Sequence, residues 1–415
     1  MVDCPPQMLE TGMKYAIITL LCASAFSTAS VPAFATDNQP LHRRILVLDS
    51  HLDTPARLDD PVWDIRQRHS FSGDGSQVDL PRMEEGALDG GFWVAFTPQG
   101  ALNPEGFAHA RRHVMKRLTG IRNMVARNDE RFALAFSAED AARIAAQGKA
   151  VVYQSIENAY PIGENTSALA TFHEHGVRML GLVHMTNNQL ADSANDPGGP
   201  RWNGLSPLGR DLVKEANRLG LVLDGSHASD AVVDQLLELS EAPIILSHSG
   251  CRDLFDRPRN IDDKRIKAIA AKGGVIQISG IFLTRTPPDP ERERAVAELL
   301  TRFGNIASPE MQAEFDSARA VLIARYPLPR ATFDDFMDNL LHALKLVGPS
   351  HVGIGVDWDG GTELIGFEDV SALPKVTERL LKEGYSAGEI ANIWGGNLLR
   401  VLAANQAHAE SRSEK

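Results

Sequence analysis

The sequence predicts an α/β protein folded as a (β/α)8 (TIM) barrel, because short apolar runs alternate with capped helices along most of the chain. The runs are apolar throughout, which is typical of parallel strands buried on both faces. A doubly wound open sheet is the alternative, but it would not bring the end of the first strand beside those of the third, fifth and sixth. The eight expected strands are Ile45–Leu48, Gly91–Phe96, Val151–Ile156, Met179–Val183, Leu221–Leu223, Ile244–Leu246, Gly274–Ser279 and Val352–Val356.

Helix start and stop signals separate these strands. Ser206 followed by Pro207 is an N-cap with proline at the first helical position, and Gly220 follows the last periodic residue. Ser386 and Glu389 have the spacing of a capping box. The helices expected from such signals are Ala138–Ala146, Leu208–Leu219, Asp262–Ala271 and Ile390–Leu402.

Residues 1–36 are expected to be a signal peptide and not part of the folded domain. Lys14 precedes the apolar stretch Tyr15–Phe26, and Ala33–Ala35 has the small-residue pattern of a cleavage site. Two acidic residues precede this stretch, which suggests Met13 as the true start. A membrane anchor is the alternative, but the apolar stretch is shorter than the ~20 residues of a spanning helix. We therefore expect an exported, periplasmic or secreted protein whose mature chain has no membrane span.

The remaining chain is predicted to be one catalytic domain, residues 37–404, with a polar tail at 405–415 that we expect to be frayed. The longest departure from strand–helix alternation is an insertion at about 283–332, with charged helical stretches at 291–303 and 308–325. Insertions at this rim of a barrel commonly shape substrate access, and a solvated packing flap is the equal alternative.

Composition excludes several classes of protein. The 415 residues are 43% hydrophobic and 23% charged, which is ordinary for a soluble globular enzyme. A formal net charge of -12 without a long basic run argues against nucleic acid or anionic lipid as a partner. Once Cys4 and Cys22 are removed with the signal peptide, Cys251 alone cannot close an intrachain disulfide.

The first apolar run leads directly into two metal-binding side chains, His51 and Asp53. Spaced two apart at a strand end, these side chains leave the backbone on the same side, so both can reach one metal ion. A lone His-x-Asp pattern arises by chance in many proteins, but its position after a buried strand favours metal binding.

Three more metal-binding side chains stand at the ends of other strands. Glu157 ends the third strand, where it could bridge two metal ions or cap the next turn. His227 and His248 follow the fifth and sixth strands, and imidazole nitrogen suits zinc, although each alone could be a core histidine. Five such residues on one rim are hard to explain as packing. The pattern predicts a barrel of the metal-dependent, amidohydrolase-like hydrolase type.

With these residues in view, the chain resembles the membrane dipeptidase (renal dipeptidase, peptidase M19) family from about Ile45 to Leu402. The polar C-terminus has no hydrophobic tail that could signal a glycolipid anchor, so the resemblance is to the bacterial exported branch. The matching segments are LVLDSHLDTP, SIENAYPIG, GVRMLGLVHMTNNQLADSA, LDGSH, IILSHSGCRDLFDRPRNIDD, GIGVDWDGG and WGGNLLRV.

The resemblance implies a site with two Zn²⁺ ions. His51 and Asp53 would hold one ion, His227 and His248 the other, and Glu157 would bridge them together with a water or hydroxide. A metal-bound hydroxide would attack the peptide bond of a dipeptide with a free C-terminal carboxylate and an L- or D-residue at that position. The resemblance further implies a homodimer.

The resemblance also implies three roles outside the metal ligands. His184 would contact the reacting carbonyl and steady the oxyanion, and Asp357 would act as the acid/base carboxylate. Arg259 would bind the substrate carboxylate with paired hydrogen bonds, with Arg257 as the weaker candidate.

Other interpretations of these residues stay open. Asp357 could be a helix N-cap, Arg259 could form a surface ion pair with Asp262 or Asp263, and His184 could support a metal ligand. The alternative function is a related metal-dependent amidohydrolase acting on an N-acyl amino acid, lactone, phosphoester or cyclic amide. A binding protein without catalysis is a third hypothesis, disfavoured because all five ligands are present.

Overall fold

The structure is a computed structural model that describes residues 40–284, 289–303, 309–327 and 329–413. The predicted signal peptide, with Cys4, Met13 and Cys22, lies outside these residues. All described residues belong to one compact unit, Gln39–Lys415. No helix in the described part of the chain has the length and apolar character needed to cross a bilayer.

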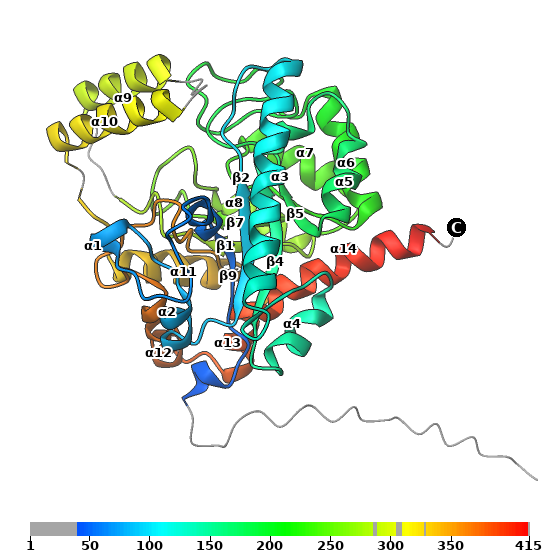
Figure 1. Cartoon of the computed structure of the whole chain (residues 1–415), viewed down its shortest axis with the longest axis vertical. Helices are drawn as coiled ribbons and strands as arrows, with labels where there is room; N and C mark the ends of the chain where they lie inside the picture. The colour runs from blue at the N-terminus through cyan, green and yellow to red at the C-terminus, as the bar shows by residue number, and fades with distance from the viewer. Residues whose placement is uncertain (1–39, 285–288, 304–308, 328, 414–415) are drawn as a thin grey trace, which may run out of the picture. The chain divides into compact units, whose positions relative to one another are not determined.

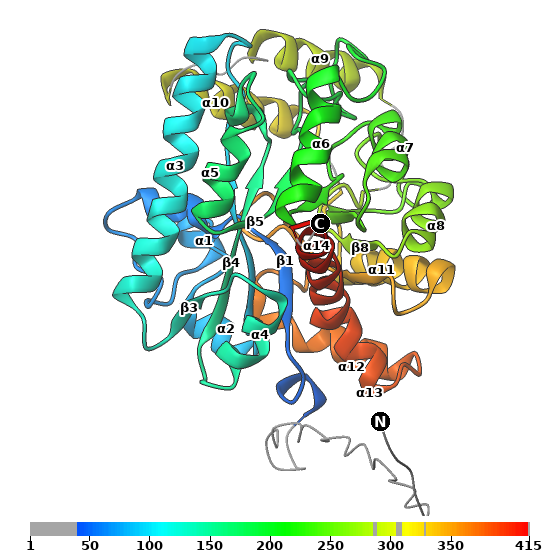
Figure 2. The same cartoon turned by 90° about the vertical axis from the view of Figure 1, so that its right-hand side faces the viewer.

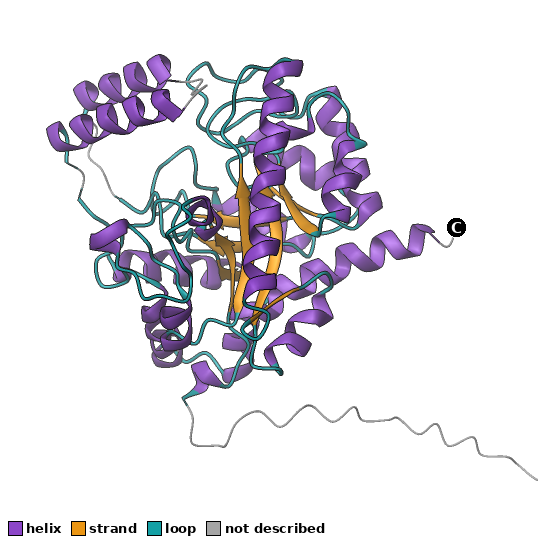
Figure 3. Ribbon diagram, viewed as in Figure 1, coloured by secondary structure: helices purple, strands orange, loops and turns teal. Residues whose placement is uncertain are grey.

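The described unit is a nearly closed barrel of eight parallel strands with helices between them, which confirms the predicted fold (Figures 1 and 3). The strands follow one another in the order β1-β2-β4-β5-β6-β7-β8-β9, and β3 pairs with the first three residues of β4. Their bounds are β1 Leu48–Leu52, β2 Gly90–Phe96, β3 Phe132–Leu134, β4 Ala150–Glu157, β5 Val177–Gly181, β6 Val222–Asp224, β7 Ile245–Ser249, β8 Val275–Ile278 and β9 Val352–Ile354.

The bounds of several strands shift by one or two residues, and two strands, β1 and β3, differ most from the prediction. β1 begins at Leu48 and runs to Leu52, so the predicted Ile45–Leu48 is too early, and His51 lies within the strand. The buried polar residues of β1 are the reason, because they interrupt the apolar pattern while the backbone continues to pair with β2. The three-residue β3 was not predicted, since it is too short to show a pattern.

Three of the four predicted helices are present nearly as expected, whereas the predicted Ile390–Leu402 is interrupted by a π-helical turn at Asn392–Gly396. Ser206 accepts a hydrogen bond from the Gly209 amide, and Gly220 ends the helix in the left-handed conformation. The α-helices are α1 Phe71–Asp74, α2 Leu80–Glu85, α3 Pro104–Arg127, α4 Ala138–Ala145, α5 Ala168–Glu174, α6 Pro207–Leu219, α7 Asp230–Leu239, α8 Asp263–Ala271, α9 Pro290–Phe303, α10 Pro309–Arg325, α11 Phe333–Val347, α12 Pro374–Lys382, α13 Ala387–Ala391 and α14 Asn397–Ser413. The short 3₁₀ turns are η1 Leu41–Arg43, η2 Thr54–Asp59, η3 Tyr160–Ile162 and η4 Val370–Ala372, and η5 Asn392–Gly396 is a π-helical turn.

The C-terminal helix differs from the expected frayed tail at 405–415. α14 continues to Ser413, and it packs against α4 and α6 (Figure 2). Asn405 is buried and donates hydrogen bonds to the carbonyls of Pro243 and Val401, and Arg412 pairs with Glu241. These contacts give the polar segment packing partners that the sequence pattern does not show.

The N-terminal half of the barrel interior is filled by apolar side chains. Buried residues from seven strands join three residues of α14 in a single cluster, so α14 covers this end of the barrel. Its members include Leu48, Phe92, Tyr153, Met179, Val222, Ile245, Val275, Leu398, Val401 and Leu402. Because apolar side chains fill this end of the barrel, polar chemistry is expected at the opposite end, where the strands have their C-terminal ends.

Candidate metal centre and active site

All eight predicted site residues lie at the C-terminal end of the barrel. Five of them come from strands β1, β4 and β7 or from the residues just after β1 and β6. The other three come from the segments after β5, β7 and β9. In chain order they are His51, Asp53, Glu157, His184, His227, His248, Arg259 and Asp357.

Glu157, the last residue of β4, lies at the centre of the cluster. Its Oε1 is 3.0 Å from His227 Nε2 and 3.3 Å from His248 Nε2, whereas its Oε2 is 3.7 Å from His51 Nε2. His51 Nε2 is also 3.6 Å from Asp53 Oδ2. The two carboxylate oxygens therefore face different imidazoles.

Three groups of side chains have donor atoms close enough to hold a metal ion, within 4.8 Å of one another: His51 with Glu157 and His248, Glu157 with His184 and His227, and His51 with Asp53 and Asp357. Glu157 belongs to two of these groups. His248 lies between His227 and His51 and so links the two groups that share Glu157. Its Nε2 is 2.9 Å from His227 Nε2, and its ring centroid is 3.7 Å from that of His51.

The protonation of the histidines suits a cation. Burial, with Arg259 and a neighbouring histidine, holds the pKa values of His227 and His248 well below 6.5, so both rings are neutral bases at pH 7. His51 Nε2 is buried and has no hydrogen-bond partner among the described residues. Neutral imidazoles and carboxylates whose donor atoms converge on one point fit a zinc-type metal.

His51 and Glu157 shift each other's pKa in opposite directions. Burial lowers the pKa of His51, but the negative charges of Glu157 and Asp53 outweigh it and raise this pKa well above 6.5. Burial raises the pKa of Glu157, but His51 and His184 together with hydrogen bonds from His227 and His248 bring it well below 4.5. The carboxylate is thus fully ionised and available as a ligand.

Two buried aspartates that the sequence reasoning missed orient these ligands. Asp49 accepts hydrogen bonds from the amides of His51 and Val356, and burial raises its pKa to about 7. Asp224 accepts from the Ser247 hydroxyl at 2.5 Å, and this hydroxyl lies 2.8 Å from Nδ1 of His248. Such partners fix the orientation of ligand rings. The sequence signal that could have identified both is an aspartate directly after a uniformly apolar run.

His184 lies beside the cluster and is its most exposed member. Its Nε2 is 3.9 Å from Glu157 Oε1, and its side chain is 29% exposed. The ring packs between Phe96 and His227, with centroid distances of 4.7 and 4.3 Å. Burial lowers its pKa below 6.5, against the opposing charge of Glu157. His184 can therefore contact both the cluster and a bound molecule.

Arg259 is buried at the β7 side of the cluster and does not form the surface ion pair considered above. Its two terminal nitrogens donate to Ser249 Oγ at 2.9 Å and to the His248 carbonyl at 2.6 Å, and its Nε has no partner among the described residues. Burial lowers its pKa to about 10, so it stays charged at pH 7. Arg257 instead points to Thr284, 3.2 Å from its carbonyl.

Asp357 follows β9 and is not a helix N-cap, because no helix starts there. Its φ of 73° places it in the left-handed region, which is strained for a residue with a side chain. Burial raises its pKa well above 3.8, and Asp53 and Glu157 add to this while His51 and Arg259 oppose it. A buried carboxyl that holds a proton beside the candidate metal ligands can act as a general acid.

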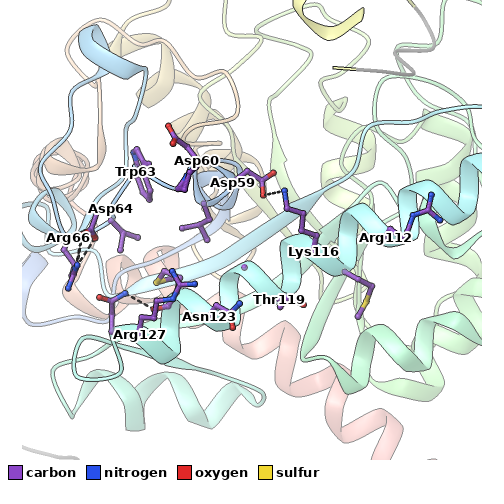
Figure 4. Close-up of a pocket in the computed structure, with 17 residues that line it drawn as sticks. Asp59, Asp60, Trp63, Asp64, Arg66, Arg112, Lys116, Thr119, Asn123 and Arg127 are labelled. Carbon is purple, nitrogen blue, oxygen red and sulfur yellow. Dashed lines mark hydrogen bonds and ion pairs between the residues drawn. The ribbon is translucent and has the colours of Figure 1, made fainter. Parts of the chain in front are cut away.

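The structure also has a cavity that lies outside the C-terminal rim of the barrel. It has a volume of about 850 Å³ and runs between the segment that follows η2 and the outer face of α3 (Figure 4). Charged side chains from both walls meet there, including Asp59 from η2 and Lys116 from α3. None of the three metal-type donor groups lines it.

A parallel barrel with histidines and carboxylates gathered at its C-terminal rim defines a metal-dependent hydrolase. The chain belongs to the membrane dipeptidase family, peptidase family M19, whose model matches residues 35–415. It is thus a metallo-dipeptidase by family.

Relatives and a solved structure agree with this assignment. The chain is 30% identical to dipeptidase tcpJ of Claviceps purpurea over 78% of this chain and 68% of that protein. It is 31% identical to dipeptidase verJ of Clonostachys rogersoniana over 79% of this chain and 75% of that protein. The crystal structure of the probable dipeptidase PvdM from Pseudomonas aeruginosa aligns with a TM-score of 0.76 and 32% identity, over 89% of this chain and 97% of that one.

Proposed function

We propose that this protein is an exported binuclear zinc dipeptidase that hydrolyses dipeptides with a free C-terminal carboxylate, whether that residue is L or D. The observation that carries the proposal is the position of Glu157, whose Oε2 lies 3.7 Å from His51 Nε2 while its Oε1 lies 3.0 and 3.3 Å from Nε2 of His227 and His248. A carboxylate whose two oxygens face separate sets of histidines is suited to bridge two cations, since it offsets their repulsion. His51 and Asp53 would hold one ion and His227 and His248 the other.

Bound ions would acidify a water molecule and polarise the scissile carbonyl. The chain's own residues supply the remaining chemistry. Asp357, buried with a raised pKa, would exchange a proton with the reacting groups and deliver it to the departing amine. His184, beside Glu157 and partly exposed, would donate a hydrogen bond to the developing oxyanion.

Arg259 would bind the substrate's terminal carboxylate. Its charge is preserved in a buried position, and its unpartnered Nε leaves one edge of the guanidinium available for a side-on pair of hydrogen bonds. Its contacts with Ser249 and the His248 carbonyl hold that edge at a fixed distance from the metal ligands. A fixed positive group at one end of the site would select short substrates with a free acid.

Export and dimer formation are part of the proposal and rest on the sequence. The apolar stretch Tyr15–Phe26 and the Ala33–Ala35 pattern support a cleaved signal peptide. Mass spectrometry of the N-terminus after expression in a bacterial host with periplasmic fractionation tests export. Light scattering of the mature protein tests the homodimer.

The test of the activity is a panel of L,L and L,D dipeptides with added zinc, beside C-terminally amidated dipeptides and N-acyl amino acids. We expect free acids to be hydrolysed with kcat/KM about 100-fold or more above the amides, and Arg259→Met to remove this difference. Equal cleavage of acids and amides by the wild type would contradict the carboxylate clamp. Turnover of N-acyl amino acids without dipeptides would favour the alternative amidohydrolase.

A further inference from the structure

A recess of about 210 Å³ opens beside the metal ligands on the side of β1, β2 and β4. Asp53, Glu157 and His184 form its inner end. Its volume is below the roughly 300–1,000 Å³ of sites for whole drug-sized ligands, so it suits one side chain.

The direction of a bound dipeptide follows from the positions of its anchors, if the proposed function holds. Arg259, the carboxylate anchor, contacts β7 through the His248 carbonyl and Ser249. The recess lies across the candidate metal ligands from it, because its strand residues come from β2 and β4 and its outer walls from η2, α3 and the loop after β9. With the scissile carbonyl at Glu157 and His184, the amino-terminal residue falls over the recess.

The walls of the recess differ in character. Ala56, Val94 and Phe96 give it apolar sides. Arg117 of α3 is the one arginine or lysine among the residues that line it, and it is buried. Asp359, another wall residue, already accepts hydrogen bonds from the Thr54 hydroxyl and the Gln77 amide. Apolar walls with a buried guanidinium favour a bound side chain that has an aliphatic part and ends in an anion.

We propose that this recess receives the side chain of the dipeptide's amino-terminal residue and that Arg117 makes it select side chains that end in a carboxylate over those that end in a cation. This inference rests on the proposed dipeptidase function. It names the substrate class as dipeptides with an acidic first residue. A lysine in the same place would bring its charge beside Arg117, and the carboxylates that line the recess are already engaged, Asp359 by Thr54 and Gln77 and Asp53 and Glu157 by the cluster of histidines.

The strength of the selection is set by Asp59, the last residue of η2. Its Oδ2 is 3.2 Å from Arg117 Nη2, and its Oδ1 is 3.1 Å from Nζ of Lys116 (Figure 4). Arg117 also donates a hydrogen bond to the Pro55 carbonyl, which holds the guanidinium in place. Part of its charge is therefore offset by Asp59, and removing the Asp59 charge should strengthen its attraction for an anionic substrate.

Lys116 provides a matched control. It contacts the same carboxylate as Arg117, but from the outer cavity in Figure 4, and its side chain is 69% exposed. Lys116→Gln and Arg117→Gln make the same change in charge at neighbouring positions of α3. Only Arg117 lines the recess.

The experiment measures kcat/KM for Glu-Ala, Gln-Ala, Lys-Ala and Ala-Ala with the zinc-loaded full chain. For the wild type we expect a Glu-Ala to Lys-Ala ratio of about tenfold or more, in line with one charge-assisted hydrogen bond. Arg117→Gln should lower the Glu-Ala to Gln-Ala ratio about tenfold, Asp59→Asn should raise it severalfold, and Lys116→Gln should leave it unchanged.

The outcomes separate the two proposals. Equal loss of kcat/KM on all four dipeptides in Arg117→Gln would show that Arg117 only supports η2, and would overturn the inference while leaving the dipeptidase intact. An Asp59→Asn variant with an unchanged or lower ratio would also overturn it. Failure of the zinc-loaded wild type to cleave any of the four dipeptides would instead refute the dipeptidase function on which the inference rests.

Discussion

The β2–β4 pair and the junction between β9 and β1 hold the same barrel together in different ways. β2 and β4 align over seven consecutive residue pairs, from Gly90 with Val151 to Phe96 with Glu157. Among the described residues, the one backbone bridge here joins Leu52 of β1 to Trp358 in the segment after β9, where the Asp53 amide donates to the Trp358 carbonyl at 2.9 Å. We call this junction the seam.

Side chains replace backbone pairing at the seam. Asp359 accepts hydrogen bonds from the Thr54 hydroxyl and the Gln77 amide, both at 2.7 Å, and its own amide donates to Gln77 Oε1. Asp357 and Asp359 both have left-handed backbones, with φ of 73° and 64°. The regular pair positions one carboxylate of the candidate site, Glu157, whereas the irregular seam positions two, Asp53 and Asp357.

The difference shows how a barrel can be rigid and still aim several carboxylates at one point. A regular ladder fixes a side chain by register, and it sends successive side chains to opposite faces. A strained backbone is not bound by this alternation, so it can direct nearby side chains toward one point. Its conformation must then be held by other groups. We therefore expect the seam to be sensitive to small changes that would be harmless elsewhere.

Gly360 offers the strongest test of the seam. A Cβ at this position would lie 1.9 Å from Asp357 Oδ1 and 2.3 Å from Asp53 Oδ2, so Gly360→Ala must displace one or both carboxylates. We expect kcat/KM to fall about 100-fold or more, since displacements of about 1 Å cost that much. Zinc content of the same samples would show whether the Asp53 site is weakened.

The matched control is Gly120→Ala in α3, where an added Cβ meets nothing within 4 Å. This variant should keep full activity and gain about 0.5–1 kcal/mol of stability, because alanine favours the helix. Gly360→Ala with activity within about threefold of the wild type would show that the seam carboxylates tolerate displacement.

His42 of η1 tests the other end of β1, away from the seam. Its Nε2 donates to the Gly86 carbonyl, so the neutral ring presents Nδ1 as an acceptor to the Thr377 hydroxyl at 2.6 Å. Burial lowers its pKa from 6.5 to about 4. The unfolded chain binds this proton more readily, so stability is complete above pH 6.5 and is lost as the pH falls toward 4.

We expect the free energy of unfolding to be about 2 kcal/mol lower at pH 5 than at pH 7 from this group. Urea titrations of the wild type and His42→Gln across this range isolate it. The opposing contributions of Asp89 and Asp359, whose pKa values burial raises to about 6, are common to both proteins and cancel in the difference. A difference that does not change with pH would contradict the assignment.

A smaller effect is expected when one hydrogen bond of the seam is removed. Thr54→Val keeps the shape of the buried side chain but leaves Asp359 without its hydroxyl donor. We expect unfolding in urea to show a loss of about 1 kcal/mol. Thr119→Val on the exposed face of α3 should change stability by less than about 0.5 kcal/mol. Equal effects of the two substitutions would mean that the seam does not depend on this bond.

The barrel and the convergence of the donor residues could be predicted from the sequence. Uniformly apolar runs mark buried parallel strands, and side chains at their C-terminal ends must meet at one rim. That is why His51 and Glu157, about a hundred residues apart, could be placed together before the structure was known.

The seam and the recess could not be predicted in this way. Asp359 and Gly360 lie in a segment without periodicity, and their partners Thr54 and Gln77 are hundreds of residues away. Arg117 is one of many basic residues on an amphipathic helix, and nothing in its spacing shows that it turns toward the site. Long-range side-chain contacts of irregular backbone leave no local pattern to read.

The measurement that tests the account most directly is the number of zinc ions bound per chain. The full-length protein, stripped of metal and reloaded, should bind two ions by elemental analysis and calorimetry. Glu157→Gln should retain at most one ion tightly and lose activity about a thousandfold or more, because both donor groups lose their shared carboxylate. A wild type that binds one ion or none, or a Glu157→Gln variant that binds two with unchanged affinity, would contradict the shared-carboxylate centre.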